Sequence, residues 1–404
     1  MVNFQFLSGL NTIGANIIDI QTDSGRVIFD FGEIFNPDSG TLPEWHHSVE
    51  NTAIFISHLH IDHIGSLDQV PADIPIYMSK DSYLLYQLLL EIEEEYPIEA
   101  TIYPLNYNEV KNIGDIQVVF KKSDHDIEGA CAMFVQTPDV KLINSGDVRL
   151  TGNFSENVKD WVREGKKFQP DIFLLEGTAF SFEEEEVGEE LTENEMHDKW
   201  KNLLNNSKQE IIFVNTYIRD TIRLRNLATI TQAKHRQIVL EPRYAYLLEK
   251  YTDYSDFLVL KELDTKEYFK DHWITLEDIQ SEPWKFVLQN SFENRAFMEN
   301  FEEGVYCHSN GEPLGDYDVR YQVLLSTVEE NNFSFEDFNV SGHATKEDLI
   351  AIAKAVDAKS TIPWHSFKPE KLLEGLAAVG LSTFLPEKET IYSLNRLNKN
   401  VVRG

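Results

Sequence analysis

Residues 51–66 read NTAIFISHLHIDHIGS, and this stretch contains four closely spaced residues of metal-ligand type. Its first half, NTAIFI, is typical of a buried strand, and its second half contains His58, His60, Asp62 and His63. Histidine and aspartate are metal ligands, and the chain has only 12 histidines among 404 residues. Alternation from a strand end would direct His58, His60 and Asp62 to one side, with His63 following at the turn. The motif therefore predicts a metal site.

The length and composition indicate a globular protein. At 404 residues with 42% hydrophobic side chains, two domains are the default expectation. The two cysteines, Cys131 and Cys307, lie far apart, which excludes a disulfide framework and favours a reducing compartment. The N-terminus lacks a basic targeting segment, and no apolar run has the length of a membrane helix. We expect a soluble, cytoplasmic protein without membrane partners.

The net charge of -32 argues against broad, non-specific affinity for nucleic acids, because polyanion binding depends on Lys and Arg. It does not exclude an enzyme that acts on nucleic acid, since a dinuclear metal site adds about four positive charges of its own. Much of the acid lies in EIEEEYPIEA (91–100) and SFEEEEVGEE (181–190), which we expect to form solvated faces or loops.

The hydrophobic pattern predicts an α/β protein. Short strands dominate the first third of the chain, with one helix at DSYLLYQLLLEIEEE (81–95). After the acidic segment 181–190, strands alternate with helices up to about residue 335. The stretch 338–366 then predicts another strand, helix and strand.

Three further candidate ligands follow strands later in the chain. His125 ends IQVVFKKSDH, Asp147 ends VKLINSGD and His365 ends STIPWH. Each histidine alone is more often an ordinary imidazole than a ligand. Together with the first motif, they make a set of the size that two metal ions about 3.5 Å apart require, including a bridging carboxylate.

The order of the motifs resembles that of the metallo-β-lactamase fold in its β-CASP branch, which includes ribonuclease J and the cleavage-and-polyadenylation endonucleases. The motifs are FDFG, SHLHIDH, SDH, SGD, LEGT, SGHA and PWHS, and the resemblance covers nearly the whole chain. It implies an α/β fold, an αββα sandwich with an inserted β-CASP α/β domain. The implied boundaries are 1–195 and 338–404 for the metallo-β-lactamase domain and 196–337 for the β-CASP domain.

The resemblance also implies a ligand set for two divalent ions, Zn²⁺ first and Mn²⁺ as the alternative. One ion would be held by His58, His60 and His125, and the other by Asp62, His63 and His365. Asp147 would bridge the two ions, and Asp30 of FDFG would support the metal-binding loop.

The same resemblance assigns catalytic residues. Asp62 has a catalytic role besides its role as a ligand, His343 of SGHA is the general acid, and Glu176 of LEGT orients it. The expected substrate-binding residues are Arg219, Arg243 and Ser341.

A basic channel in the β-CASP domain is a further expectation. Arg219 and Arg223 are four residues apart, so we expect both on one helical face that lines this channel. Around Arg243 the sequence LEPRYAY replaces a Gly-Arg-Ser-like turn, so 5′ exonuclease action is not assumed. The chain stops soon after IYSLNRLNKNVVRG, so we expect no C-terminal dimerisation domain, and the oligomeric state is open.

The leading functional hypothesis is a metal-dependent phosphodiesterase that hydrolyses RNA. A DNA nuclease of the same branch is an alternative, although those enzymes usually lack the histidine equivalent to His365. A hydrolase of small esters, thioesters or lactams is disfavoured by the inserted domain and by SGHA. A non-catalytic partner protein is disfavoured because all seven ligands are present. A basic protein partner that supplies RNA affinity, the mode of cleavage and the sequence specificity are left open.

Overall fold

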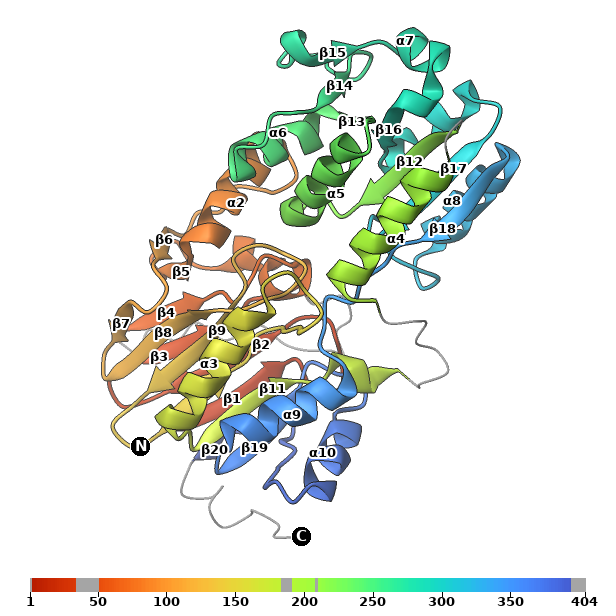
Figure 1. Ribbon diagram of the computed structural model, residues 1–404. Helices are drawn as coiled ribbons and strands as arrows, with labels where there is room; N and C mark the ends of the chain where they lie inside the picture. Colours follow the sequence, from red (N-terminus) through yellow and green to blue (C-terminus); the bar gives the residue numbers. More distant parts are fainter. Residues whose placement is uncertain (1, 34–50, 183–190, 208–209, 394–404) are drawn as a thin grey trace. The chain divides into compact units, whose positions relative to one another are not determined.

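The computed structural model describes residues 2–33, 51–182, 191–207 and 210–393 (Figure 1). The chain divides into two compact units, each with its own sheets and cores. The first unit comprises Met1–Gln87, Glu95–Glu189 and Gly342–Gly404. The second unit comprises Leu88–Glu94 and Glu190–Ser341.

The first sheet of the first unit brings the FDFG and SHLHIDH motifs to one edge. Its strand order is β20 (Tyr392–Ser393), β1 (Asn3–Ser8), β2 (Ile17–Gln21), β3 (Arg26–Phe29), β4 (Thr52–Phe55), β5 (Ile76–Ser79) and β6 (Ile102–Leu105). Strands β3 and β4 are parallel, and Phe29 pairs with Phe55. Asp30 and the histidine motif therefore leave the sheet side by side.

The second sheet places three other motifs at a common edge. Its strand order is β19 (Ser360–Trp364), β11 (Ile172–Glu176), β10 (Lys141–Asn144), β9 (Cys131–Gln136), β8 (Ile116–Lys122) and β7 (Val110–Ile113). Strand β11 runs parallel to both β10 and β19. Because carboxyl ends of neighbouring parallel strands meet at one edge, Asp147, Glu176 and His365 come together there.

The two sheets pack face to face across an apolar core. Phe29 and Phe55 of the first sheet and Phe120 and Leu174 of the second are buried in it. The other face of the second sheet is covered by α3 (Ser155–Phe168), α9 (Lys346–Val356) and α10 (Pro369–Ala378) (Figure 1). Helix α1 (Ile61–Ile64) also belongs to the first unit. Helix α2 (Lys80–Glu91) begins in the first unit, and its last residues, from Leu88, are assigned to the second. The predicted α/β sandwich is confirmed.

The second unit contains a parallel sheet with helices on both faces. Its strand order is β15 (Trp273–Ile274), β14 (Leu258–Leu260), β13 (Gln237–Leu240), β16 (Phe286–Gln289), β12 (Ile211–Thr216), β17 (Gly304–Ser309) and β18 (Phe333–Asp337). Its helices are α4 (Glu193–Asn206), α5 (Thr221–Ala233), α6 (Pro242–Thr252), α7 (Leu276–Ser281) and α8 (Val319–Glu330). Ile211 and Phe213 lie in one core, and Ile212 and Val214 in another. Burial on both faces explains why the first four residues of β12, Ile211–Val214, are all apolar.

Most predicted elements are present. Short strands dominate the first third of the chain as predicted, and the helix predicted at 81–95 corresponds to α2. Strands β6 and β7 were not predicted, because they are half exposed and mix polar with apolar residues. The acidic residues 183–190 lie outside the described part. Among the described residues, no helix combines the length and apolarity needed to cross a membrane.

Candidate metal centre

The histidine motif is a loop followed by one helical turn. Strand β4 ends at Phe55, so His58 and His60 lie in the loop, and Asp62 and His63 lie in α1. The prediction that strand alternation directs these side chains was wrong, because the chain leaves the sheet before His58. The loop and the helical turn bring the side chains together instead.

Contacts with the FDFG strand end fix the shape of this loop. Asp30 accepts hydrogen bonds from the backbone N–H and the hydroxyl of Ser57, at 2.7 and 2.9 Å. Gly32 packs so tightly that a Cβ atom there would lie 1.8 Å from the carbonyl oxygen of Asp62. A side chain at Gly32 would therefore displace the metal-binding loop.

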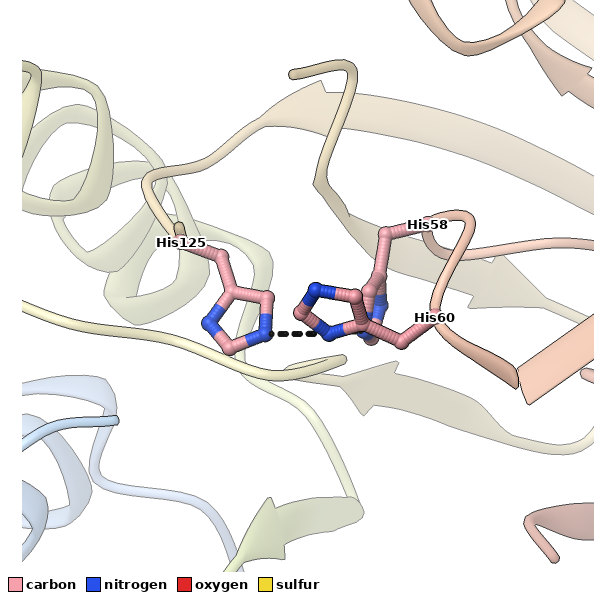
Figure 2. A group of neighbouring side chains, drawn as sticks. All are labelled: His58, His60 and His125. Atoms are coloured by element: carbon pink, nitrogen blue, oxygen red, sulfur yellow. Dashed lines mark hydrogen bonds between the residues drawn. The ribbon is translucent and has the colours of Figure 1, made fainter. Parts of the chain in front are cut away.

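Three histidines form the first position of the centre. His60 Nδ1 lies 3.2 Å from His58 Nε2 and 3.0 Å from His125 Nε2 (Figure 2). Ligand atoms about 2 Å from a common ion are separated by about 3 to 4 Å. Burial and the nearby His63 hold the pKa of His58 well below its usual range, and burial lowers the pKa of His125 to about 3. The neutral imidazole is the form that binds metal.

Two acids and two histidines form the second position: Asp62, His63, Asp147 and His365. Asp62 Oδ2 lies 2.9 Å from His365 Nε2 and 3.4 Å from His63 Nε2. Burial would raise the pKa of Asp62, but His63 and His365 outweigh it and hold that pKa well below its usual range. The carboxylate is therefore charged and available as a ligand.

Asp147 belongs to both positions. Its Oδ2 atom lies 3.6 Å from His58 Nε2 and 3.8 Å from His125 Nε2. The same atom lies 3.3 Å from His63 Nε2 and 3.7 Å from His365 Nε2. Its Oδ1 atom is buried and has no hydrogen-bond partner among the described residues. A carboxylate in this environment is suited to bridge two cations.

In His58, His63, His125 and His365, the ring nitrogen that points away from the metal position also has a polar partner. Its partners are the Ser57 hydroxyl for His58 (2.9 Å), Asp30 for His63 (2.9 Å), the Thr178 hydroxyl for His365 (2.7 Å) and the Gly342 carbonyl for His125. Metal-binding histidines in proteins are usually held in this way. The residues therefore fit two divalent cations in both donor type and orientation.

We expect Asp30→Asn to weaken metal binding at the second position by about 10- to 100-fold. The substitution keeps the size of the side chain but removes the negative charge that holds His63 Nδ1. Competition of Zn²⁺ between the protein and a chromophoric chelator measures the affinity. Asp160→Asn, on the exposed side of α3, is the control. Equal affinities of Asp30→Asn and wild type would contradict this role.

His343 and Glu176 lie beside the ligands as a pair. His343 Nδ1 is 3.3 Å from Glu176 Oε1 and 4.0 Å from Asp147 Oδ2. Glu176 is fully buried at the end of β11, and its other oxygen accepts the backbone N–H of Thr178 at 2.8 Å. Burial would lower the pKa of His343, but the Glu176 carboxylate outweighs it and raises the pKa to about 9. The imidazole is thus kept ready to donate a proton.

The expected substrate-binding arginines converge on one residue of the second unit. Arg243, in α6, forms an ion pair with the Glu94 carboxylate, and Arg219 donates to the Glu94 carbonyl oxygen at 3.2 Å. Both arginines are partly exposed, and Ser341 is exposed. Their role in substrate binding stays a prediction.

Arg223 does not line a channel, which corrects the expectation of a helical face shared with Arg219. Its side chain is fully buried and pairs with Glu193 at 2.5 Å. Arg219 precedes α5, whose N-cap is Asp220. Spacing of four residues predicts a common face only inside a helix, and here the helix begins between the two arginines.

Several residues of the centre were not predicted from the sequence. They are Asn16, Ser57, Asp126 and Thr178. Asn16 Nδ2 lies 2.9 Å from His63 Nε2, and Asp126 directly follows His125 in the motif SDHD. The position of Asp126 next to a predicted ligand was a signal that could have revealed it.

Comparisons with known proteins agree with the motif resemblance. No family model matches the chain. It is 23% identical to ribonuclease J of Mycoplasma genitalium over 407 aligned residues, which cover 91% of this chain and 68% of that protein. It is 21% identical to ribonuclease J of Pyrococcus abyssi, covering 90% of each. A solved structure of a protein of unknown function from Enterococcus faecalis V583 has a TM-score of 0.85 and 25% identity, over 97% of this chain and 100% of that one. The predicted similarity to ribonuclease J is confirmed.

Proposed function

We propose that this chain is a metal-dependent phosphodiesterase that hydrolyses RNA with two divalent cations, Zn²⁺ in the first instance. The observation that supports this most is the position of Asp147 Oδ2, within 3.8 Å of ligand nitrogens of both groups. RNA as the substrate class rests on the similarity to ribonuclease J. We assign residues 196–337 to the inserted β-CASP domain.

In the proposed chemistry, the bound cations and the side chains have different roles. Two bound cations would activate water at neutral pH and neutralise oxygens of the phosphodiester. His343 would then give its proton to the leaving oxygen, a step that a positioned acid accelerates. Glu176 would hold the His343 ring and balance its charge, since the two side chains are 3.3 Å apart.

Metal analysis and a product ladder test this proposal. We expect two cations per chain, measured by elemental analysis after dialysis against metal-free buffer. The loaded protein is then incubated with end-labelled RNA and DNA that carry 5′-triphosphate or 5′-monophosphate ends. Cleavage of RNA alone supports the proposal, whereas cleavage of DNA alone supports the DNA nuclease. A folded protein that binds no metal would refute the proposed metal-dependent function.

Replacing Arg219 and Arg243 together with alanine should lower RNA cleavage about 10-fold and leave hydrolysis of bis-p-nitrophenyl phosphate unchanged. Each phosphate contact contributes to RNA affinity, and the salt dependence of binding should decrease with the loss of each contact. Cleavage rates at several salt concentrations measure both effects. Lys250→Ala, an exposed cation of the same helix as Arg243, is the control. Equal loss with both substrates would indicate damage to the fold or the metal centre.

A further inference from the structure

Asp126 points a carboxylate oxygen at two histidines of the first position. Its Oδ1 atom lies 3.3 Å from His125 Nε2 and 3.7 Å from His60 Nε2. That oxygen is buried and has no hydrogen-bond partner among the described residues. A buried carboxylate oxygen that accepts no hydrogen bond is costly, and its contacts are with these two imidazoles, so their orientation has to explain its position.

The orientation of His60 supplies that explanation. Its Nδ1 atom faces His58 and His125, which makes Nδ1 the atom directed toward the first position. The opposite nitrogen, Nε2, therefore carries the ring proton when a cation is bound, and this nitrogen faces Asp126. The other four histidines have a hydroxyl, carboxylate or carbonyl oxygen at the equivalent place.

We propose that Asp126 is a metal-positioning residue, which orients His60 through Nε2 and strengthens binding of the cation at the first position. The inference rests on the proposed function, because it requires that the centre binds metal. A carboxylate behind a ligating imidazole fixes the ring and raises its basicity. Asp126 also adds a negative charge to a position that otherwise consists of neutral imidazoles and Asp147.

Gly342 explains how the carboxylate is kept in place. A Cβ atom at Gly342 would lie 2.6 Å from both Cγ and Oδ1 of Asp126. The Gly342 carbonyl oxygen also accepts a hydrogen bond from His125 Nδ1. Gly342 of the SGHA motif therefore packs directly on the Asp126 side chain. The carboxylate fits there only because Gly342 has no side chain.

Two variants test the proposal through metal binding. Asp126→Asn keeps the size of the side chain and removes its charge, and Asp126→Ala also removes the acceptor. Zn²⁺ dissociation constants are measured by chelator competition for wild type, both variants and the control Asp81→Asn. Asp81 is a carboxylate of the same unit that contacts Lys122 and Tyr107. In the Asp126 variants, we expect one of the two Zn²⁺ dissociation constants to rise about 10- to 100-fold, with the larger rise in Asp126→Ala. Neither constant should change in the control.

Nuclear magnetic resonance of ¹⁵N-histidine-labelled, zinc-loaded protein supplies a second readout. The Nε2–H signal of His60, assigned with a His60→Gln variant, should shift in Asp126→Asn because the carboxylate that lies 3.7 Å from this nitrogen has lost its charge. Constants within twofold of wild type for both variants would overturn the proposal. Weaker binding without a shift of the His60 signal would also overturn it. If wild type itself binds no cation, the proposed function fails instead.

Discussion

Asp147→Ala is expected to lose both cations and to reduce RNA cleavage on the order of 1,000-fold or more. Its Oδ2 atom is within 3.8 Å of four ligand nitrogens, two from each position. Removal of the carboxylate therefore takes a ligand from both cations and leaves a group of buried histidines with less compensating charge. Elemental analysis and the RNA cleavage assay measure the two effects.

The matched control for this variant is Asp160→Ala, which removes an exposed carboxylate from the same unit. Circular dichroism of both variants checks that the fold is retained. If Asp147→Ala retains two cations with wild-type affinity, Asp147 is not a bridging ligand. If it loses only one cation, the other position is complete without it.

The candidate metal ligands could be predicted as a set, because a dense first motif is followed by residues of ligand type at the ends of later strands. His58, His60 and His63 are concentrated in a short motif, and Asp147 and His365 follow apolar strands that meet in a parallel arrangement. The neighbours that hold these ligands were harder to predict. A hydroxyl such as that of Thr178 has no distinctive sequence pattern, and its contact with His365 spans 187 residues along the chain.

The positions and partners of two basic residues could not be predicted from their spacing in the sequence. Arg223 was expected to line a channel because it lies four residues from Arg219, yet it is fully buried. Glu193, in a different helix, compensates its charge, and no local pattern predicts which acid from a distant helix will pair with it. Arg243 likewise pairs with Glu94, a residue 149 positions earlier. In a chain of net charge -32, each arginine has many acids as possible partners, and the tertiary structure determines which one it contacts.

His343→Ala should keep both cations and lower RNA cleavage by about 100-fold or more, the range expected for loss of a general acid. The leaving oxygen of RNA is a poor leaving group, so it needs a proton as the bond to phosphorus breaks. The nitrophenolate released from bis-p-nitrophenyl phosphate stabilises its own charge. Hydrolysis of that compound should therefore fall by less than about 10-fold in the same variant.

The comparison of the two substrates separates three roles for His343. If the variant loses metal together with both activities, His343 is a ligand. This role has to be tested because His343 Nδ1 lies only 4.0 Å from Asp147 Oδ2. Equal loss with both substrates and full metal content would indicate that His343 stabilises charge rather than donating a proton. Glu176→Gln, which keeps the shape of the orienting side chain, should show the same substrate dependence with a smaller loss, because His343 is still present but less firmly held.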